Sequence, residues 1–142
     1  MIIKASKEYI KKIIEIELDA LGHTLGESFF ELEMDNPFSH IYLYEKDNEF
    51  VGYISLRIVD EKAELLNFGV KKLYQNQGIG QKIFSFVLED LKKEKVKTLI
   101  LEVRSKNHTA IHFYQKFGGK KIHELKNYYG DDDAHIYLLE VK

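Results

Sequence analysis

Hydrophobic residues follow two different spacings along the chain. Where they recur every three or four residues the pattern predicts amphipathic helices, and these cover residues 6–19, 28–34, 78–91 and 107–117. Where they alternate with polar residues or form short runs between polar turns the pattern predicts strands, at residues 1–4, 40–45, 50–58, 63–70, 98–103, 121–125 and 135–141. The order β-α-α-β-β-β-α-β-α-β-β predicts an α/β protein (an α+β mixed sheet) with helices packed on the sheet.

The segment 98–103, TLILEV, is nearly all apolar. A strand that is covered on both faces has this composition, which is typical of a parallel or central strand. Polar residues stand at the start of two predicted helices, Ser6 at the first and Asn107 at the last. Both residue types favour the N-cap position, so we expect each to cap its helix.

Composition narrows the class of protein. The 142 residues predict a single domain, 1–142, and hydrophobic and charged residues make up 44% and 31% of it, a globular balance. The net charge is -2 and no basic block is present, so we expect no nucleic-acid partner. No apolar run reaches the ~18 residues of a membrane span, and the first residues do not resemble a signal peptide. We therefore expect a cytoplasmic protein without a membrane partner; the lack of cysteine suits that compartment.

The hexapeptide Gln75-Asn76-Gln77-Gly78-Ile79-Gly80 lies between a predicted strand and a predicted helix. The first N–H groups of a helix have no partner inside the helix and attract anions, and glycine lets a phosphate come close to the backbone. The segment therefore favours a pyrophosphate cradle, although a simple turn with an N-cap fits the same residues. It is neither a Walker loop nor a GxGxxG fingerprint.

This hexapeptide resembles the [RQ]-x-x-G-x-[GA] signature of the GNAT N-acetyltransferases, which bind acetyl-CoA. The resemblance covers essentially the whole chain, through AELLNFGV (63–70), LILEVRSKNHTAIHFYQKFG (99–118) and NYYGDDDA (127–134). The last two segments are similar to one branch of the family, the bacterial ribosomal-protein-alanine (RimI-type) N-acetyltransferases. The resemblance implies a GNAT-like fold, in which about four helices flank a seven-stranded mixed sheet with splayed central parallel strands.

The resemblance also implies where acetyl-CoA, the cosubstrate, would bind; from the residues themselves we expect no metal. The acetyl and pantetheine portion would lie against Phe68, Gly69 and Val70, and the counterpart of Asn107 lies near the CoA arm. The pyrophosphate would lie against Gln75, Asn76, Gln77, Gly78, Ile79, Gly80 and Gln81. Because these side chains are uncharged where relatives often have Arg or Lys, we expect the backbone to carry phosphate binding, with Lys71, Lys72 and Lys82 as helpers.

Acetyl transfer to an amine requires a base and an acid. Glu102 is the one carboxylate in an apolar strand, where burial would favour its acting as a base, and the phenol of Tyr114 suits a proton donor. In the similar family these positions are the general base and the general acid, and we expect the same roles here. Glu102 could instead be a strand-end charge paired with Arg104 or a lysine, and Tyr114 a core aromatic.

The loop before the last strand contains Tyr128 and Tyr129. They resemble the tyrosine pair that contacts the substrate N-terminus in the family, although loop tyrosines can equally serve packing. The adjacent acidic run, Asp131 to Asp133, does not have the spacing of an EF-hand and favours an exposed turn. His108 and His112 lie on one helical face without a third ligand in sequence reach, which favours solvated histidines over a metal site.

Together with these observations, the resemblance predicts an acetyl-CoA-dependent N-acetyltransferase whose acceptor is the N-terminal α-amine of a protein, such as a ribosomal protein. The alternatives are acetylation of a small-molecule amine or a lysine side chain, and a noncatalytic acyl-CoA-binding module. Gly118-Gly119 and a tyrosine loop without proline depart from the family pattern and bear on the acceptor more than on the cofactor. We expect a monomer or a weak dimer.

Overall fold

The computed structural model describes all residues, 1–142. Its helices are α1 (Ile10–Leu21), α2 (Glu27–Glu33), α3 (Ile79–Lys93) and α4 (His108–Lys116). Its strands are β1 (Ile2–Lys4), β2 (Ser39–Lys46), β3 (Glu49–Val59), β4 (Lys62–Val70), β5 (Thr98–Arg104), β6 (Lys120–Leu125) and β7 (Ala134–Glu140). The order of helices and strands predicted from the hydrophobic spacing is confirmed.

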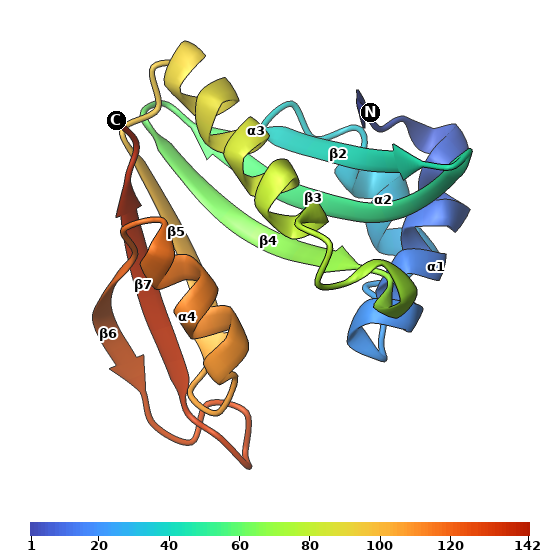
Figure 1. The fold of residues 1–142 in the computed structure, drawn as a ribbon. Helices are drawn as coiled ribbons and strands as arrows, with labels where there is room; N and C mark the ends of the chain where they lie inside the picture. The colour runs from blue at the N-terminus through green and yellow to red at the C-terminus, as the bar shows by residue number, and fades with distance from the viewer.

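All seven strands form one sheet in the order β1-β2-β3-β4-β5-β7-β6. Every neighbouring pair is antiparallel except β4 and β5. In these two parallel strands, only Lys62–Glu64 of β4 pairs with Thr98–Ile100 of β5. Beyond that point the strands diverge, as Figure 1 shows. The predicted splayed, mixed sheet is confirmed, and the splay separates β1–β4 from β5, β7 and β6.

The helices cover the sheet on both faces. On one face α3 and α4 bury the larger apolar core, which includes Phe84 and Leu91 of α3 and Leu99 and Leu101 of β5. On the other face, α1 and α2 lie behind the sheet in Figure 1, and Ile13 and Ile16 pack with Phe30, Leu43 and Tyr53 in a second core. The two cores lie on opposite faces because side chains alternate along each strand.

Strand β5 departs from the sequence-based expectation that both of its faces are covered. Leu99, Leu101 and Val103 are buried, but Glu102 and Arg104 are exposed. The reason is that α1 packs on β3 and β4 and leaves the neighbouring face of β5 open. Glu102 is therefore not buried, and the expectation of a buried carboxylate is wrong.

The two predicted helix caps have different outcomes. Asn107 caps α4, where its side chain accepts a hydrogen bond from the Ala110 N–H at 3.1 Å. Ser6 precedes only a short 3-10 turn, makes no side-chain cap bond, and lies before the actual start of α1 at Ile10. None of the four helices combines the length and the apolar character that crossing a membrane would require.

Candidate active site

A cavity of about 630 Å³ lies where β4 leaves β5. Its walls come from the end of β4, the following loop, the first turn of α3, one side of α4 and the end of α1. The lining residues are Ala20, Leu21, Phe68, Gly69, Val70, Tyr74, Gln75, Asn76, Gly78, Ile79, Gly80, Gln81, Asn107, Thr109, Ala110, Phe113, Tyr114 and Lys116. Segments far apart in sequence meet here because the splayed strands leave a gap, which α3, α4 and the end of α1 flank.

The loop into α3 presents its main chain to this cavity. Gly78 is the N-cap of α3 and adopts φ 79°, a left-handed conformation that favours glycine. The backbone N–H groups of residues 76–81 donate no hydrogen bond within the chain. The Gln75 side chain donates to the Val70 carbonyl oxygen at 2.8 Å and so holds the loop against the end of β4. Six neighbouring donors without a partner can receive the oxygens of an anion.

The two glycines of this loop serve different purposes. Gly78 is required by its backbone angle, whereas a Cβ on Gly80 would meet only the Phe68, Val70 and Phe113 side chains, at 3.7, 3.9 and 4.0 Å. These are ordinary contact distances, so the chain alone does not need glycine at position 80. The missing side chain instead leaves space in the cavity beside the free N–H groups.

Lys116 is the one charged side chain in the cavity lining. Sequence reasoning missed it, although its position three residues after Phe113 places both on one side of α4. Lys71, expected to help bind phosphate, is instead paired with Glu15 at 2.7 Å and Glu49 at 3.3 Å. The Gln77 side chain points elsewhere as well, because it accepts a hydrogen bond from Lys46 at 2.9 Å.

Tyr114 is at once a core residue and part of the cavity wall. Its side chain packs on Phe84 and Phe113, with ring centroids 5.6 and 5.4 Å apart, and only 8% of it is exposed. Burial raises the pKa of Tyr114 above its ordinary value of 10.0. The hydroxyl is therefore protonated at neutral pH and is available as a proton donor.

Glu102 does not line this cavity and extends from the open face of β5. It accepts a hydrogen bond from the Tyr129 hydroxyl. Arg104, two residues further on, pairs with Asp131 at 3.0 Å and holds its guanidinium 4.0 Å from the centre of the Tyr129 ring. The alternative of a Glu102–Arg104 pair is thus not what the structure contains.

The two loop tyrosines have different surroundings. Their rings meet edge to face at 5.1 Å, but Tyr128 is 55% exposed while Tyr129 is half-buried between Arg104 and Glu102. Partial burial, together with the carboxylate of Glu102, raises the pKa of Tyr129. We call Glu102, Arg104, Tyr128 and Tyr129 the acceptor side, to distinguish it from the cavity.

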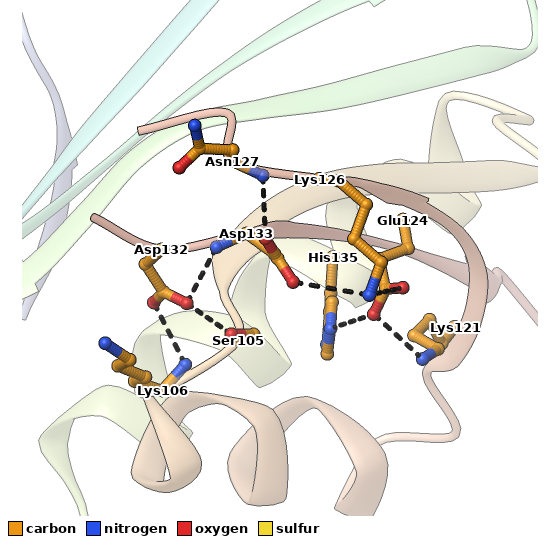
Figure 2. A network of polar contacts seen from close by, with 9 residues as sticks. All are labelled: Ser105, Lys106, Lys121, Glu124, Lys126, Asn127, Asp132, Asp133 and His135. Atoms are coloured by element: carbon orange, nitrogen blue, oxygen red, sulfur yellow. Dashed lines mark hydrogen bonds and ion pairs between the residues drawn. The ribbon is translucent and has the colours of Figure 1, made fainter. Parts of the chain in front are cut away.

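The acidic run beside these tyrosines is not simply an exposed turn. Asp132 is buried and bonds with Ser105 and the Lys106 N–H, as Figure 2 shows. The expectation of an exposed turn is therefore wrong for this residue. No group of three or more His, Asp or Glu side chains in the chain could hold a metal ion.

The loop between α1 and α2, near the end of α1 that lines the cavity, is held by another buried carboxylate that the sequence did not reveal. Glu17 is fully buried and accepts hydrogen bonds from Thr24 and from the Leu25 N–H at 3.1 Å. Its other carboxylate oxygen accepts from Tyr53 and from Asn67 at 2.7 Å. Glu17 thus ties the loop to β3 and β4 next to Phe68, a residue of the cavity wall.

Comparison with known proteins gives consistent results. The model of the acetyltransferase (GNAT) family matches residues 10–119. A Bacillus subtilis (strain 168) protein with the provisional name [ribosomal protein bS18]-alanine N-acetyltransferase is 34% identical over 135 residues, which are 94% of this chain and 89% of the relative. The Escherichia coli (strain K12) protein named [ribosomal protein bS18]-alanine N-acetyltransferase is 32% identical over 68% of each chain.

The fold is similar to a solved structure of the same kind. The crystal structure of the ribosomal-protein-S18-alanine N-acetyltransferase from Escherichia coli superposes with a TM-score of 0.94 and 26% sequence identity, over 100% of this chain and 94% of the other.

Proposed function

The chain belongs to the GNAT acetyltransferase family and is an N-acetyltransferase that uses acetyl-CoA, and we propose that its acceptor is the α-amino group of a protein N-terminus. The two relatives compared above are named for an alanine of ribosomal protein bS18. An alanine N-terminus of a ribosomal protein is therefore the first acceptor to test.

We assign acetyl-CoA to the cavity between β4 and α4. The free N–H groups of residues 76–81 are suited to the pyrophosphate, because they are unpaired donors at the positive end of a helix. The bare Gly80 leaves the space that an approaching phosphate requires. Phe68, Gly69 and Val70, together with Asn107, would hold the acetyl and pantetheine portion, and Lys116 replaces Lys71 as the proposed cationic helper.

We assign the base to Glu102 and the acid to Tyr114. An α-amino group has a pKa near 8 and is mostly protonated at neutral pH, so a proton must leave the amine before its nitrogen can attack. Glu102 takes that proton, directly or through a water; the amine nitrogen bonds to the thioester carbonyl carbon, and the carbon–sulfur bond breaks. Tyr114 then donates its proton to the departing thiolate, which leaves as CoA. The nitrogen gives up its second proton, which converts the Tyr114 phenolate back to the phenol, and the proton on Glu102 passes to solvent.

The observation that carries the choice of acceptor is the position of Glu102 on an open face. Glu102 and Tyr128 are both exposed, whereas a site for a small metabolite normally encloses its ligand. An open surface beside the base admits a chain that continues away from its amino group. Tyr128 and Tyr129 would contact the first residues of that chain.

A pair of peptides tests this proposal. Both have the same alanine-initiated sequence with one internal lysine; the first has a free N-terminus and an acetylated lysine, and the second an acetylated N-terminus and a free lysine. We expect mass spectrometry after incubation with acetyl-CoA to find one new acetyl group on the first peptide only.

Modification of the second peptide at an equal rate would contradict the proposed acceptor. So would preferential modification of a polyamine supplied as a third acceptor in the same assay. If none of the amines were modified although CoA still bound, the result would favour a noncatalytic acyl-CoA-binding module.

A further inference from the structure

Asp132 is a buried carboxylate in a loop whose other residues are largely exposed. Only 7% of it is accessible. One carboxylate oxygen accepts hydrogen bonds from the Ser105 hydroxyl and the Asp133 N–H, the latter at 2.7 Å, and the other accepts from the Lys106 N–H at 3.1 Å. Figure 2 shows these bonds, and the two from Ser105 and Lys106 join the loop to the turn between β5 and α4. The contact with Ser105 lowers the pKa of Asp132, so the accepting form is the anion.

The main chain around Asp132 extends the same connection. Its carbonyl oxygen accepts a hydrogen bond from the Tyr129 N–H at 3.1 Å, and the carbonyl oxygen of Asp133 accepts from the Ser105 N–H at 3.0 Å. The Asp133 carboxylate accepts from the Asn127 N–H at 2.7 Å. The tyrosine loop is thereby closed on itself and attached to one turn of the chain.

That turn lies between the two halves of the proposed active site. Glu102 and Arg104 precede it on β5, and Asn107 follows it at the start of α4, which carries Tyr114. Tyr129 reaches Glu102 with its hydroxyl and contacts Arg104 with its ring. A residue that fixes the tyrosine loop to this turn therefore fixes Tyr129 relative to Glu102.

We infer that Asp132 is a positioning residue, which holds Tyr129 against Glu102 by anchoring the tyrosine loop to the turn between β5 and α4. It acts through Tyr129 and does not itself reach the reacting atoms. The inference rests on the proposed function, because that proposal assigns Glu102 as the base and Tyr129 as a contact of the acceptor.

The test is the substitution Asp132→Asn, which keeps the size of the side chain. The amide oxygen can still accept hydrogen bonds from Ser105 and Asp133. The amide nitrogen then faces the Lys106 N–H, and because both groups are donors, that hydrogen bond is lost. We expect kcat/KM for the free-N-terminus peptide to fall about tenfold or more, the order of a lost hydrogen bond to a charged group. The affinity for CoA should change less than about twofold.

A double substitution distinguishes positioning from general damage. Because Asp132 acts through Tyr129, Asp132→Asn should lower kcat/KM much less in a Tyr129→Phe background than in the wild type. Asp60→Asn is the matched control, since Asp60 is exposed in the turn between β3 and β4 and makes no side-chain contact with the site. It should behave like the wild type. Fully additive losses in the double variant would overturn the inference.

Hydrogen exchange of residues 126–133 provides a readout that does not depend on activity. We expect faster amide exchange in this loop for Asp132→Asn, and a smaller increase for Ser105→Ala, which removes one donor and leaves the aspartate in place. Unchanged exchange in Asp132→Asn would also overturn the inference. Failure of the wild type to acetylate the peptide would instead contradict the proposed function, while the exchange result still decides the role of Asp132.

Discussion

The cavity and the acceptor side are built by different parts of the polypeptide. The cavity presents the main chain: unpaired N–H groups, a left-handed Gly78 and a Gly80 without a side chain. The acceptor side presents side chains: a carboxylate, a guanidinium and two phenol rings. A main-chain site can be specified by a few consecutive residues, whereas a side-chain site requires contacts between segments that fold together.

Because of this difference, we expect substitutions at the two sites to have different effects. In the cavity, the side chains of Gln75 and Gln77 bond with the chain itself, so their loss acts first on the loop and only then on a ligand. On the acceptor side, Glu102 and Tyr129 are 27 residues apart and bond with each other, so a change in either removes a partner directly. We expect cavity variants to alter CoA affinity and acceptor-side variants to alter turnover.

Tyr114 is the strictest test of this separation, because it lines the cavity but is proposed to act in turnover. Tyr114→Phe removes one oxygen and leaves the ring packed on Phe84 and Phe113. We expect kcat to fall by up to about 10²-fold, at the low end of the contribution of one general acid, with nearly unchanged CoA affinity. The measurement is steady-state kinetics together with calorimetric titration of CoA.

Tyr74→Phe is the matched control for this variant, since it removes another hydroxyl from the cavity wall and should keep nearly full turnover. Full turnover in Tyr114→Phe would reduce Tyr114 to a packing residue.

The next largest effect is expected at Gly78, on the main-chain side. Gly78→Asp and Gly78→Asn have the same shape, and both residue types tolerate left-handed backbone better than most others. The aspartate adds a negative charge where the pyrophosphate is proposed to bind. Calorimetry should therefore find CoA binding at least about tenfold weaker in Gly78→Asp than in Gly78→Asn, or ~1.4 kcal/mol. Equal affinities in the two folded variants would reject the phosphate cradle.

The smallest effect is expected at the ion pairs that Glu124 forms with Lys126 and His135, where the tyrosine loop joins β6 and β7. Lys126, with further help from His135, lowers the pKa of Glu124 from 4.5 to about 2. A lowered folded-state pKa means that the ionised group adds stability above pH 4.5 and that this stability is lost as the pH falls toward 2. The melting temperature of the wild type should exceed that of Glu124→Gln above pH 4.5.

This difference in melting temperature should shrink below pH 4.5, whereas CoA affinity at neutral pH should be the same for both proteins. A constant difference down to pH 2 would show that the pair does not contribute in this way.

The sequence predicted most of what depends on local pattern. The order of the strands and helices followed from hydrophobic spacing, and the loop into α3 followed from two glycines before a helix. The cap at Asn107 followed from residue type. The resemblance to a family added the splay of β4 and β5, which no spacing reveals, because strand order and pairing length depend on contacts across the whole sheet.

What the sequence did not reveal are contacts between distant polar side chains. Glu17 and Asp132 are charged residues in segments that look solvated, yet both are buried by hydrogen bonds with other segments. The open face of β5 was missed for a related reason, since an apolar run does not tell which helices extend far enough to cover it. Lys71 was misassigned because its carboxylate partners, Glu15 and Glu49, lie more than 20 residues away.

The central claim is that Glu102, on the acceptor side, takes the proton of the acceptor amine, while the cavity holds acetyl-CoA. The most direct test is the pH–rate profile of Glu102→Gln at saturating acetyl-CoA, a substitution that keeps size and hydrogen bonding but removes the base. We expect kcat to fall by about 10²–10⁴-fold at neutral pH and to recover partly at high pH, where the free amine already exists. A profile of wild-type shape with wild-type kcat would contradict the claim.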